Sequence, residues 1–548
     1  MLRTFEEAIM RSFGTEGRVR PEHHYIVPRT EEIADFIRRV KNGKYIVLFA
    51  PRQTGKTTFF RLALEALVAE DPTYFPIQLD FQTMRNTAPV TFYDRLYYHI
   101  NMQIESVFQK RDEVLSDTLA QFLANTQLTD DFSMLMFFRQ LVGMLNSDFH
   151  KQGLANTKVV LLIDEFDGIP RTVVSDFLYT LRQIYLSDQL HCPHSVGIVG
   201  VKSIAQLDYD RSVSPFNIQD EFRLPNFTLE QVQELLSQYT DEVGQVFATE
   251  VIESIHKETA GQPVLVNRLA QILTTELEIP KTKPITMPHF LKAYRQLVRG
   301  RNVNIQHLTT NIRRDRRFER LLMNIMSYEE GLDFNLRDEH LDELATYGVI
   351  TEDADGMCQI ANPIYLYCIM QAFKPTMNGL EQQYFHEDNI DGFQGYLTAA
   401  GQIDMERVLD NFRDFIARAG FKILQVPDTP QESVGRHLLL TYLDLFARSV
   451  GGTLSFETET GRGRMDLLIT HEREKYIVET KIWRGDSRYQ AGKKQLAAYL
   501  KLEGAVQGYY VVFDHRRNPE PRVETEELDG VTIRSYVIPV IQEQPSLQ

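Results

Sequence analysis

Short apolar runs alternate with longer stretches of helical periodicity over the first half of the chain. The runs lie at 45–49 (YIVLF), 75–81 (FPIQLDF), 159–163 (VVLLI) and 195–201 (SVGIVGV). Runs of this length that are bounded by turn signals are typical of buried strands. Between them, stretches such as TTFFRLALEALVAE and TVVSDFLYTLRQIYL repeat their apolar residues at helical spacing. Strands that alternate with helices predict a parallel α/β sheet.

In the region after these strands, local sequence signals predict where helices begin and end. Thr228 followed by Gln231 has the spacing of a capping box, which predicts that a helix begins with LEQVQELLSQY. Gly261 is expected to end the next helix, and Pro263 to open the one after it.

The pattern changes near residue 285, where the strand signals stop. RRDRRFERLLMNIM and LRDEHLDELATYG predict two helices, and two short extended runs follow around an Asp355-Gly356 turn. Helix, helix and hairpin in this order indicate a winged helix. Residues 375–415 have a polar helical pattern, and a second α/β pattern runs from about 421 to 541.

The size and charge of the chain limit its class. A chain of 548 residues is expected to hold two to four domains. The N-terminal residues lack the apolar core of a signal peptide, and no apolar run approaches the roughly 20 residues of a membrane span. The three cysteines, Cys192, Cys358 and Cys368, are widely spaced and predict neither disulfides nor a CxxC metal site. We therefore expect a cytoplasmic protein without a membrane partner.

The balance of 59 Lys and Arg against 75 Asp and Glu gives a net charge of −16. This balance argues against a protein that coats nucleic acid nonspecifically, because phosphate affinity comes mainly from positive surface. Two local basic stretches remain, and each is either a solvated face or a nucleic-acid contact. One stretch runs from 462 to 501. The other is an arginine group made of Arg295, Arg299, Arg301, Arg313, Arg314, Arg316, Arg317 and Arg320.

A phosphate-binding loop follows the first apolar run. The sequence from Ala50 to Thr58 is APRQTGKTT, and a helix follows it. In this context it is a P-loop, whose N–H groups and helix N-terminus face phosphates. Gly55, Lys56, Thr57 and Thr58 are expected to bind ATP, with Lys56 on the β- and γ-phosphates and the Thr57 hydroxyl on Mg²⁺. Ala50 stands where the first glycine of this motif is usual.

The run VVLLI is followed directly by Asp164 and Glu165. A carboxylate at the end of a buried strand can lie beside the Mg²⁺ held by Thr57, and Glu165 is then placed to polarise the attacking water. The alternative is a pair of acids that caps a loop after a core strand. The P-loop upstream favours the catalytic interpretation.

Residues 21–373 as a whole resemble the AAA-like, STAND-related bacterial ATPases. The matching pieces are HYIVPR, the P-loop, LLIDEFD, VGIVGVKS, SPFNI, LPNFTLEQV and Gly261-Gln262-Pro263. The resemblance implies a polar sensor at Ser203 and an arginine finger at Arg211. It also implies a winged-helix region after the ATPase core. We expect the chain to assemble into a homo-oligomer.

A second set of charged residues lies near the C-terminus. GRMDLLI is followed by HERE at 471–474 and then by KYIVETK, which predicts two strands joined by a tight turn. Alternation along a strand puts Glu479 and Lys481 on one face. If the hairpin is centred on 471–474, Asp466 falls opposite 479–481, although one bulge would alter this. Two close carboxylates suit Mg²⁺ or Mn²⁺, and Lys481 would orient the water or stabilise developing charge.

Residues 421–541 resemble the PD-(D/E)xK nuclease superfamily, with Asp466 and Glu479-Thr480-Lys481 matching its motif. The resemblance implies a further acid on the preceding helix, for which Glu432 is the candidate and His437 the alternative. It also implies a role for Gln495, with Tyr499, on the following helix. Met465 stands where the motif has proline. The alternative is a surface hairpin whose Glu and Lys form an exposed ion pair. Four basic residues nearby are expected to hold the substrate backbone: Lys493, Lys494, Arg484 and Arg488.

The sequence thus predicts a multidomain α/β protein. The expected parts are a P-loop AAA-like ATPase domain at 1–284, a winged-helix-like domain at 285–374, a helical linker at 375–420 and a PD-(D/E)xK nuclease-like domain at 421–548. Its expected metal ligands are Thr57, Asp164, Asp466 and Glu479.

The expected function is ATP-regulated, metal-dependent cleavage of nucleic acid, with DNA as the expected form and foreign-DNA defence as the setting. A regulatory protein partner is also expected. The alternative is a nucleotide-switched scaffold that binds DNA or protein without cutting it. A hydrolysing motor is the least favoured function because helicase motifs are not recognisable.

Overall fold

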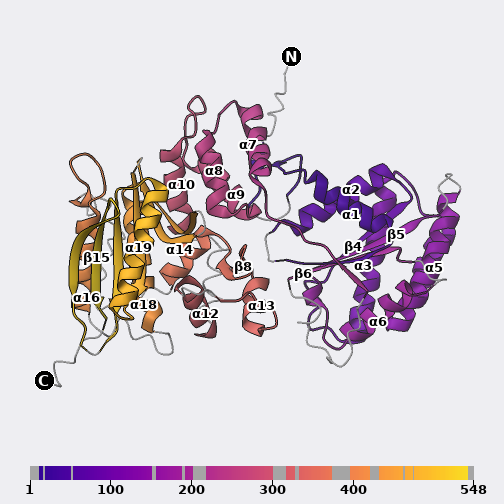
Figure 1. The fold of residues 1–548 in the computed structure, drawn as a ribbon. Coiled ribbons are helices and arrows are strands. Elements are labelled where there is room, and N and C mark those ends of the chain that lie inside the picture. The colour runs from indigo at the N-terminus through magenta and orange to yellow at the C-terminus, as the bar shows by residue number, and fades with distance from the viewer. Residues whose placement is uncertain are drawn as a thin grey trace, which may run out of the picture. The chain divides into compact units, whose positions relative to one another are not determined.

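The computed structural model of the chain describes residues 11–540 apart from 16–18, 51–53, 151–155, 188–191, 202–217, 300–315, 328–331, 373–394, 420–430, 461–462, 473 and 517 (Figure 1). The chain divides into two compact units. The first is Met1–Ile285 with Ala345–Gly348, and the second is Thr286–Leu344 with Val349–Gln548. None of the helices in the described ranges has both the length and the apolar character that a membrane span needs.

The first unit is built on a five-stranded parallel sheet in the order β4-β5-β6-β3-β7. All four predicted strands are confirmed to within a residue or two. The strands are β3 (Tyr45–Phe49), β4 (Tyr74–Asp80), β5 (Lys158–Asp164), β6 (Ser195–Gly200) and β7 (Gln219–Glu221). Because β6 lies between β3 and β5, the P-loop strand and the strand that ends in Asp164 are separated by one strand.

Alternate residues of these strands are buried on opposite faces of the sheet. One face packs on α1 (Thr30–Lys41) and α2 (Lys56–Glu70). The other packs on α3 (Pro89–Lys110), α5 (Asp131–His150) and α6 (Val174–Tyr185). Figure 1 shows these two helical layers on either side of the strands. With α4 (Asp117–Asn125), helices α3 and α5 form an insertion between β4 and β5.

A helical subdomain follows the sheet in the first unit. It contains α7 (Leu229–Val243), α8 (Thr249–Thr259), α9 (Pro263–Gln271) and a short π-helix (Ile272–Glu276). The predicted capping box is confirmed, since the Thr228 hydroxyl accepts from the Gln231 amide and the Gln231 side chain accepts from the Thr228 amide. The predicted stop and restart are also confirmed, with Pro263 as the first residue of α9.

The second unit begins with helices and a small hairpin. These are α10 (Met287–Arg299), α12 (Arg316–Ser327), α13 (Glu339–Thr346), β8 (Ile350–Glu352), β9 (Cys358–Ile360) and α14 (Pro363–Ala372). The strands β8 and β9 pair antiparallel, and Gly356 at the turn has φ of +81°. The predicted order of two helices and a hairpin is therefore confirmed.

The rest of the second unit is a six-stranded mixed sheet in the order β10-β11-β12-β13-β15-β14. Its strands are β10 (Thr453–Thr460), β11 (Gly463–His471), β12 (Glu474–Ile482), β13 (Gln507–Asp514), β14 (Arg522–Leu528) and β15 (Val531–Pro539). The strand β11 is antiparallel to its neighbours β10 and β12, whereas β12, β13 and β15 are parallel.

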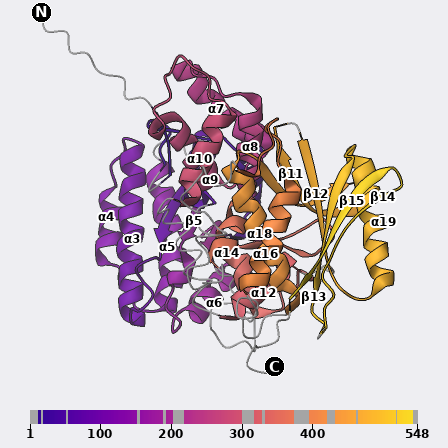
Figure 2. The same ribbon diagram turned by 90° about the vertical axis from the view of Figure 1, so that its left-hand side faces the viewer.

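Helices cover both faces of this sheet (Figure 2). On one face lie α16 (Met405–Ala419) and α18 (Gln431–Ser449), and on the other lies α19 (Asp486–Glu503). The sequence pattern predicts a helical linker at 375–420, a range that contains α16. Instead it packs on β15, and the Arg534 guanidinium lies 3.1 Å from the Glu406 carboxylate. The end of the predicted linker is thus attached to the C-terminal sheet.

Candidate functional sites

The P-loop residues gather where β3 leads into α2. Gly55 precedes the helix with φ of +83°, a left-handed conformation that glycine adopts without strain. Lys56 is only 7% exposed, and its ammonium donates to the Ala50 carbonyl over 2.6 Å. Thr58 lies half-buried in the first turn of α2. The lysine is therefore held inside the loop, at the helix end that attracts phosphate.

The predicted magnesium ligands of this site are brought together. The Thr57 hydroxyl donates to the Asp164 carboxylate over 2.7 Å, although 107 positions separate the two residues. The other oxygen of Asp164 accepts from the Glu165 amide. The Thr57 hydroxyl at the start of α2 and the Asp164 carboxylate at the end of β5 form the hard-oxygen donor set that Mg²⁺ prefers, so the residues fit this ion.

The segment after Asp164 turns sharply. Glu165 has φ of 50° and ψ of 45°, which is a strained conformation for a residue with a side chain. Asp167, to which sequence reasoning gave no role, accepts a hydrogen bond from the Val201 amide over 2.7 Å. This bond fixes the end of β6 to the turn after β5. The predicted sensor Ser203 and arginine finger Arg211 lie outside the described residues.

Three pieces of the AAA-like pattern form one tertiary contact around Arg29. Its guanidinium is buried, donates to the Pro225 carbonyl over 2.8 Å and lies over the ring of Phe227. Burial lowers the pKa of Arg29 to about 10. The Phe227 amide in turn donates to the Gly261 carbonyl. The motifs HYIVPR, LPNF and GQP therefore join α1 to the helical subdomain.

In the second unit, the predicted hairpin register is confirmed. The β11–β12 ladder runs from His471 opposite Glu474 to Leu467 opposite Val478, and there it ends. Asp466 is the next residue. One of its oxygens accepts from both the amide and the hydroxyl of Thr480, at 2.8 and 2.9 Å. The Asp466 carboxylate thus accepts a backbone hydrogen bond from β12 just beyond the last paired residues, at a point where the two strands separate.

Glu479 is completely buried beside this carboxylate, with an exposed fraction of 0%. The Lys481 ammonium lies 3.1 Å from one Glu479 oxygen, and the Asp466 amide lies 3.5 Å from the other. Burial and the neighbouring Asp466 charge raise the pKa of Glu479 to about 7, against the opposite effect of Lys481. The alternative of an exposed surface ion pair is wrong, because Glu479 has no exposed surface.

Sequence reasoning missed Arg436. This residue of α18 is 7% exposed, and its guanidinium lies 3.2 Å from the second oxygen of Asp466. Its only sequence signal is a cation within a largely apolar helix. The candidate acid Glu432 lies one turn earlier on the same helix, which places both residues on one face. The side chains of Glu432 and His437 lie outside the described part of the structure.

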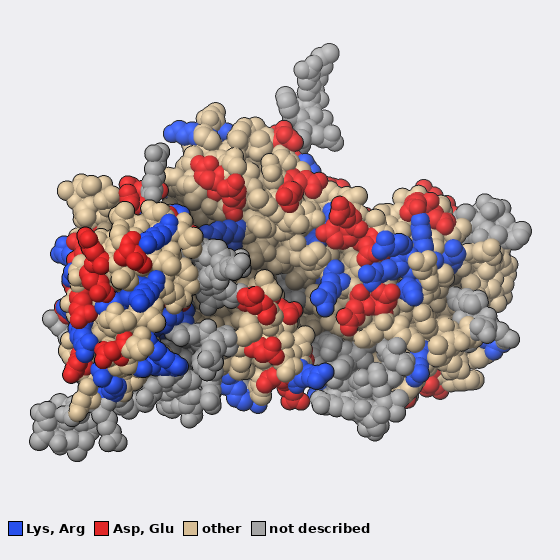
Figure 3. All heavy atoms as spheres, viewed as in Figure 1, with Lys and Arg blue, Asp and Glu red and all other residues tan. Residues whose placement is uncertain are grey.

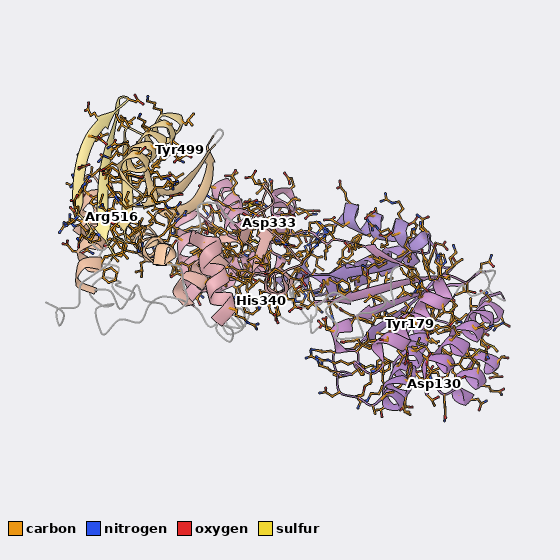
Figure 4. The ribbon with its side chains drawn as sticks, turned by 60° about the horizontal axis from the view of Figure 1, so that its bottom comes forward. Asp130, Tyr179, Asp333, His340, Tyr499 and Arg516 are labelled. Atoms are coloured by element: carbon orange, nitrogen blue, oxygen red, sulfur yellow. The ribbon has the colours of Figure 1, made fainter. Side chains whose placement is uncertain are left out.

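Some residues of α19, the helix that follows β12, make contacts other than those predicted for them. The Gln495 side-chain amide donates to the Tyr499 hydroxyl over 2.8 Å. Tyr499 is labelled in Figure 4. Lys493 is wrong as a substrate contact, because it is 1% exposed and pairs with Glu526 at 2.7 Å and Glu524 at 3.3 Å. Lys494, Arg484 and Arg488 are exposed. On the face seen in Figure 3, basic and acidic side chains are interspersed over the C-terminal domain.

At the site in the second unit, the described residues offer a metal ion two carboxylates, those of Asp466 and Glu479. Among those residues, no group of three or more His, Cys, Asp or Glu side chains has a metal-binding arrangement. Magnesium is commonly bound through one or two carboxylates, several waters and substrate phosphates. Asp466 and Glu479 fit an ion of this kind, whereas a cage made of protein ligands alone is excluded for the described residues.

The parallel sheet, the buried P-loop lysine and the Thr57–Asp164 pair define a P-loop ATPase. Residues 15–366, more than half of the chain, match the model of the AAA-like domain family, and the chain belongs to this family. Its cofactor is ATP with Mg²⁺. Residues 403–517 match a second model, described as a domain of unknown function (DUF8371).

Solved structures resemble about two thirds of the chain. A Walker-type ATPase of Pyrococcus abyssi is 18% identical, with 65% of this chain and 99% of that chain covered and a TM-score of 0.44. The RuvB Holliday junction branch migration motor of Thermotoga maritima is 14% identical, with 62% and 93% covered and a TM-score of 0.31. Cdc6p of Pyrobaculum aerophilum is 14% identical, with 63% and 94% covered and a TM-score of 0.33. No curated protein matches the chain.

Proposed function

We propose that this AAA-like ATPase is an ATP-regulated nuclease that uses Mg²⁺ or Mn²⁺ to hydrolyse phosphodiester bonds, with DNA as substrate. The observation that carries the proposal is the convergence of Asp466, Glu479 and Lys481 where β11 and β12 separate. Buried acids with a strongly shifted pKa beside a specific charge partner are typical of functional sites. The order of helix, three antiparallel strands, helix and parallel strand also supports a PD-(D/E)xK-like domain.

Each residue has a chemical task in this proposal. Asp466 and Glu479 would hold the ion, which supplies an activated water and stabilises charge on the scissile phosphate. Lys481 is 21% exposed, so its ammonium can meet a phosphate oxygen while it stays near Glu479. Water adds to phosphorus, the P–O bond to the leaving strand breaks, and the leaving oxygen takes up a proton.

ATP would control this step through the first unit. Lys56, Thr57 and Asp164 hold the nucleotide, and Glu165 follows at the turn where an attacking water is polarised. A homo-oligomer, a regulatory protein partner and defence against foreign DNA are parts of the same proposal. The small hairpin after α12 and α13 supports a winged helix, a motif that would contact the nucleic acid.

The test is cleavage of plasmid, linear DNA and RNA by the full chain, with Mg²⁺ or Mn²⁺ and with or without ATP. Lys481→Ala should abolish cleavage while ATP binding remains intact. Lys475→Ala is the matched control, because Lys475 lies at the other end of β12 in an exposed pair with Glu503. Cleavage by Lys481→Ala at the wild-type rate would refute the nuclease.

A second candidate function is a nucleotide-switched scaffold that binds DNA or protein without cutting. The observation that favours it is the charge balance around Asp466 and Glu479, since each already has a cationic partner. ATP-dependent DNA binding without cleavage under any divalent ion would select this function.

A further inference from the structure

Four charges are closely grouped at the separating ends of β11 and β12. Asp466 pairs with Arg436 at 3.2 Å, and Glu479 pairs with Lys481 at 3.1 Å. Two of the four, Glu479 and Arg436, have little or no contact with solvent. The group is balanced with both acids ionised, so a divalent ion that enters adds charge to a cluster that is already neutral.

Both oxygens of Asp466 have partners. One accepts from the Thr480 amide and hydroxyl, and the other faces the Arg436 guanidinium. The Thr480 donors are neutral and can remain when a cation binds the carboxylate. Arg436 carries a full positive charge, and two cations a few ångströms apart repel each other strongly where water is excluded. An ion at Asp466 therefore has to displace Arg436.

The position of Arg436 depends on a close helix–strand approach. Its neighbour Gly435 lies against the ring of Phe513 in β13, and a Cβ at position 435 would be 2.7 Å from that ring. A larger residue there would push α18 away from the sheet. The glycine thus lets the helix lie deep enough for the next side chain to reach Asp466.

We propose that Arg436 is a latch that competes with the divalent ion for Asp466. The inference rests on the proposed function and adds its regulation, because the nuclease site is closed at the stage of metal loading. Arg436 is a positioning residue here, since it acts on the site through Asp466.

The helix that carries Arg436 connects the latch to the rest of the second unit. Besides the sheet, α18 packs on α12 and α14. These helices belong to the segment that follows the ATPase core in the sequence. A shift of α12 or α14 would move α18 and withdraw Arg436 from Asp466.

The test measures Mn²⁺ binding to the nucleotide-free full chain by calorimetry and electron paramagnetic resonance, with Asp466→Asn used to identify the site. Arg436→Gln keeps hydrogen-bonding capacity and removes the charge, and we expect it to tighten Mn²⁺ binding by roughly tenfold or more. Arg436→Lys keeps the charge and should bind Mn²⁺ about as weakly as wild type. Arg413→Gln, on α16 in pairs with Asp410 and Asp414, is the control for a general charge effect.

Each outcome decides one of the two proposals. Unchanged or weaker Mn²⁺ binding by Arg436→Gln would overturn the latch, even if the protein cuts DNA. Equal tightening in Arg436→Lys would overturn it as well, because the guanidinium's charge would then have no part in the effect. Tighter Mn²⁺ binding without cleavage under any condition would leave the latch standing and refute the nuclease.

Discussion

Glu479→Gln should remove a pH-dependent cost from the C-terminal sheet of the ion-free protein. The folded pKa of Glu479 is about 7, whereas its ordinary value is 4.5. Below pH 4.5 the carboxyl is protonated in both the folded and unfolded states, and burial costs nothing extra. The cost grows as pH rises from 4.5 to about 7 and is constant above that, because the folded state then contains a buried carboxylate. The contribution of Glu479 to the free energy of unfolding therefore falls as pH rises from 4.5 to about 7.

The size of the effect follows from the shift. A difference of one pKa unit corresponds to about 1.4 kcal/mol, so the full cost is about 3 kcal/mol above pH 7. Glutamine has nearly the same volume and no charge, so the variant should lack this dependence. Lys481 would then lose its ion pair with Glu479, but it is partly exposed and can turn its ammonium to water.

The assay is hydrogen exchange of the amides of 474–482, followed by mass spectrometry of the full chain in chelator at pH 5 and pH 8. Exchange rates are corrected for the intrinsic effect of pH. The opening free energy of wild type should fall between the two pH values, while that of Glu479→Gln should stay constant. Glu474→Gln, at the exposed start of β12, should behave as wild type. Equal pH dependence in wild type and Glu479→Gln would refute the reasoning.

Two further predictions concern the first unit. Gly261→Ala should lower the free energy of unfolding of this unit by roughly 2 kcal/mol or more, as measured by denaturation. The reason is that φ at position 261 is +68° and the new Cβ would lie 1.9 Å from the Phe227 carbonyl oxygen. Gly244→Ala has a similar φ of +81° with open space around the Cβ and should cost about 1 kcal/mol, so equal losses would contradict the steric argument. Lys56→Ala should abolish binding of a fluorescent ATP analogue, whereas Thr57→Ala should remove the Mg²⁺ dependence of binding. Full Mg²⁺-dependent binding by either variant would contradict the assigned site.

Much of the architecture could be predicted because its signals are local. The runs at 45–49 and 159–163 are uninterrupted and apolar, and the capping box needs only the spacing of Thr228 and Gln231. The β11–β12 register follows from counting residues around one turn, and this counting predicts that Asp466 lies next to Glu479.

The missed features depend on partners that are distant in sequence. Arg436 reaches Asp466 across 30 positions and through the packing of a glycine on Phe513. The sequence pattern predicts an exposed base at Lys493, but its acidic partners, Glu524 and Glu526 of β14, lie 31 or more positions later in the chain. Spacing within one helix contains no information about either contact.

One of the two edge strands of the C-terminal sheet, β14, restricts how copies of this chain can associate. An unpaired strand edge invites a second copy to add its own strand, and acidic side chains along the edge oppose such addition. β14 has the sequence RVETEEL, so joining two copies along it would bring Glu524, Glu526 and Glu527 close to the same residues of the other copy. Self-association of the kind proposed for this ATPase must therefore use a surface other than the β14 edge.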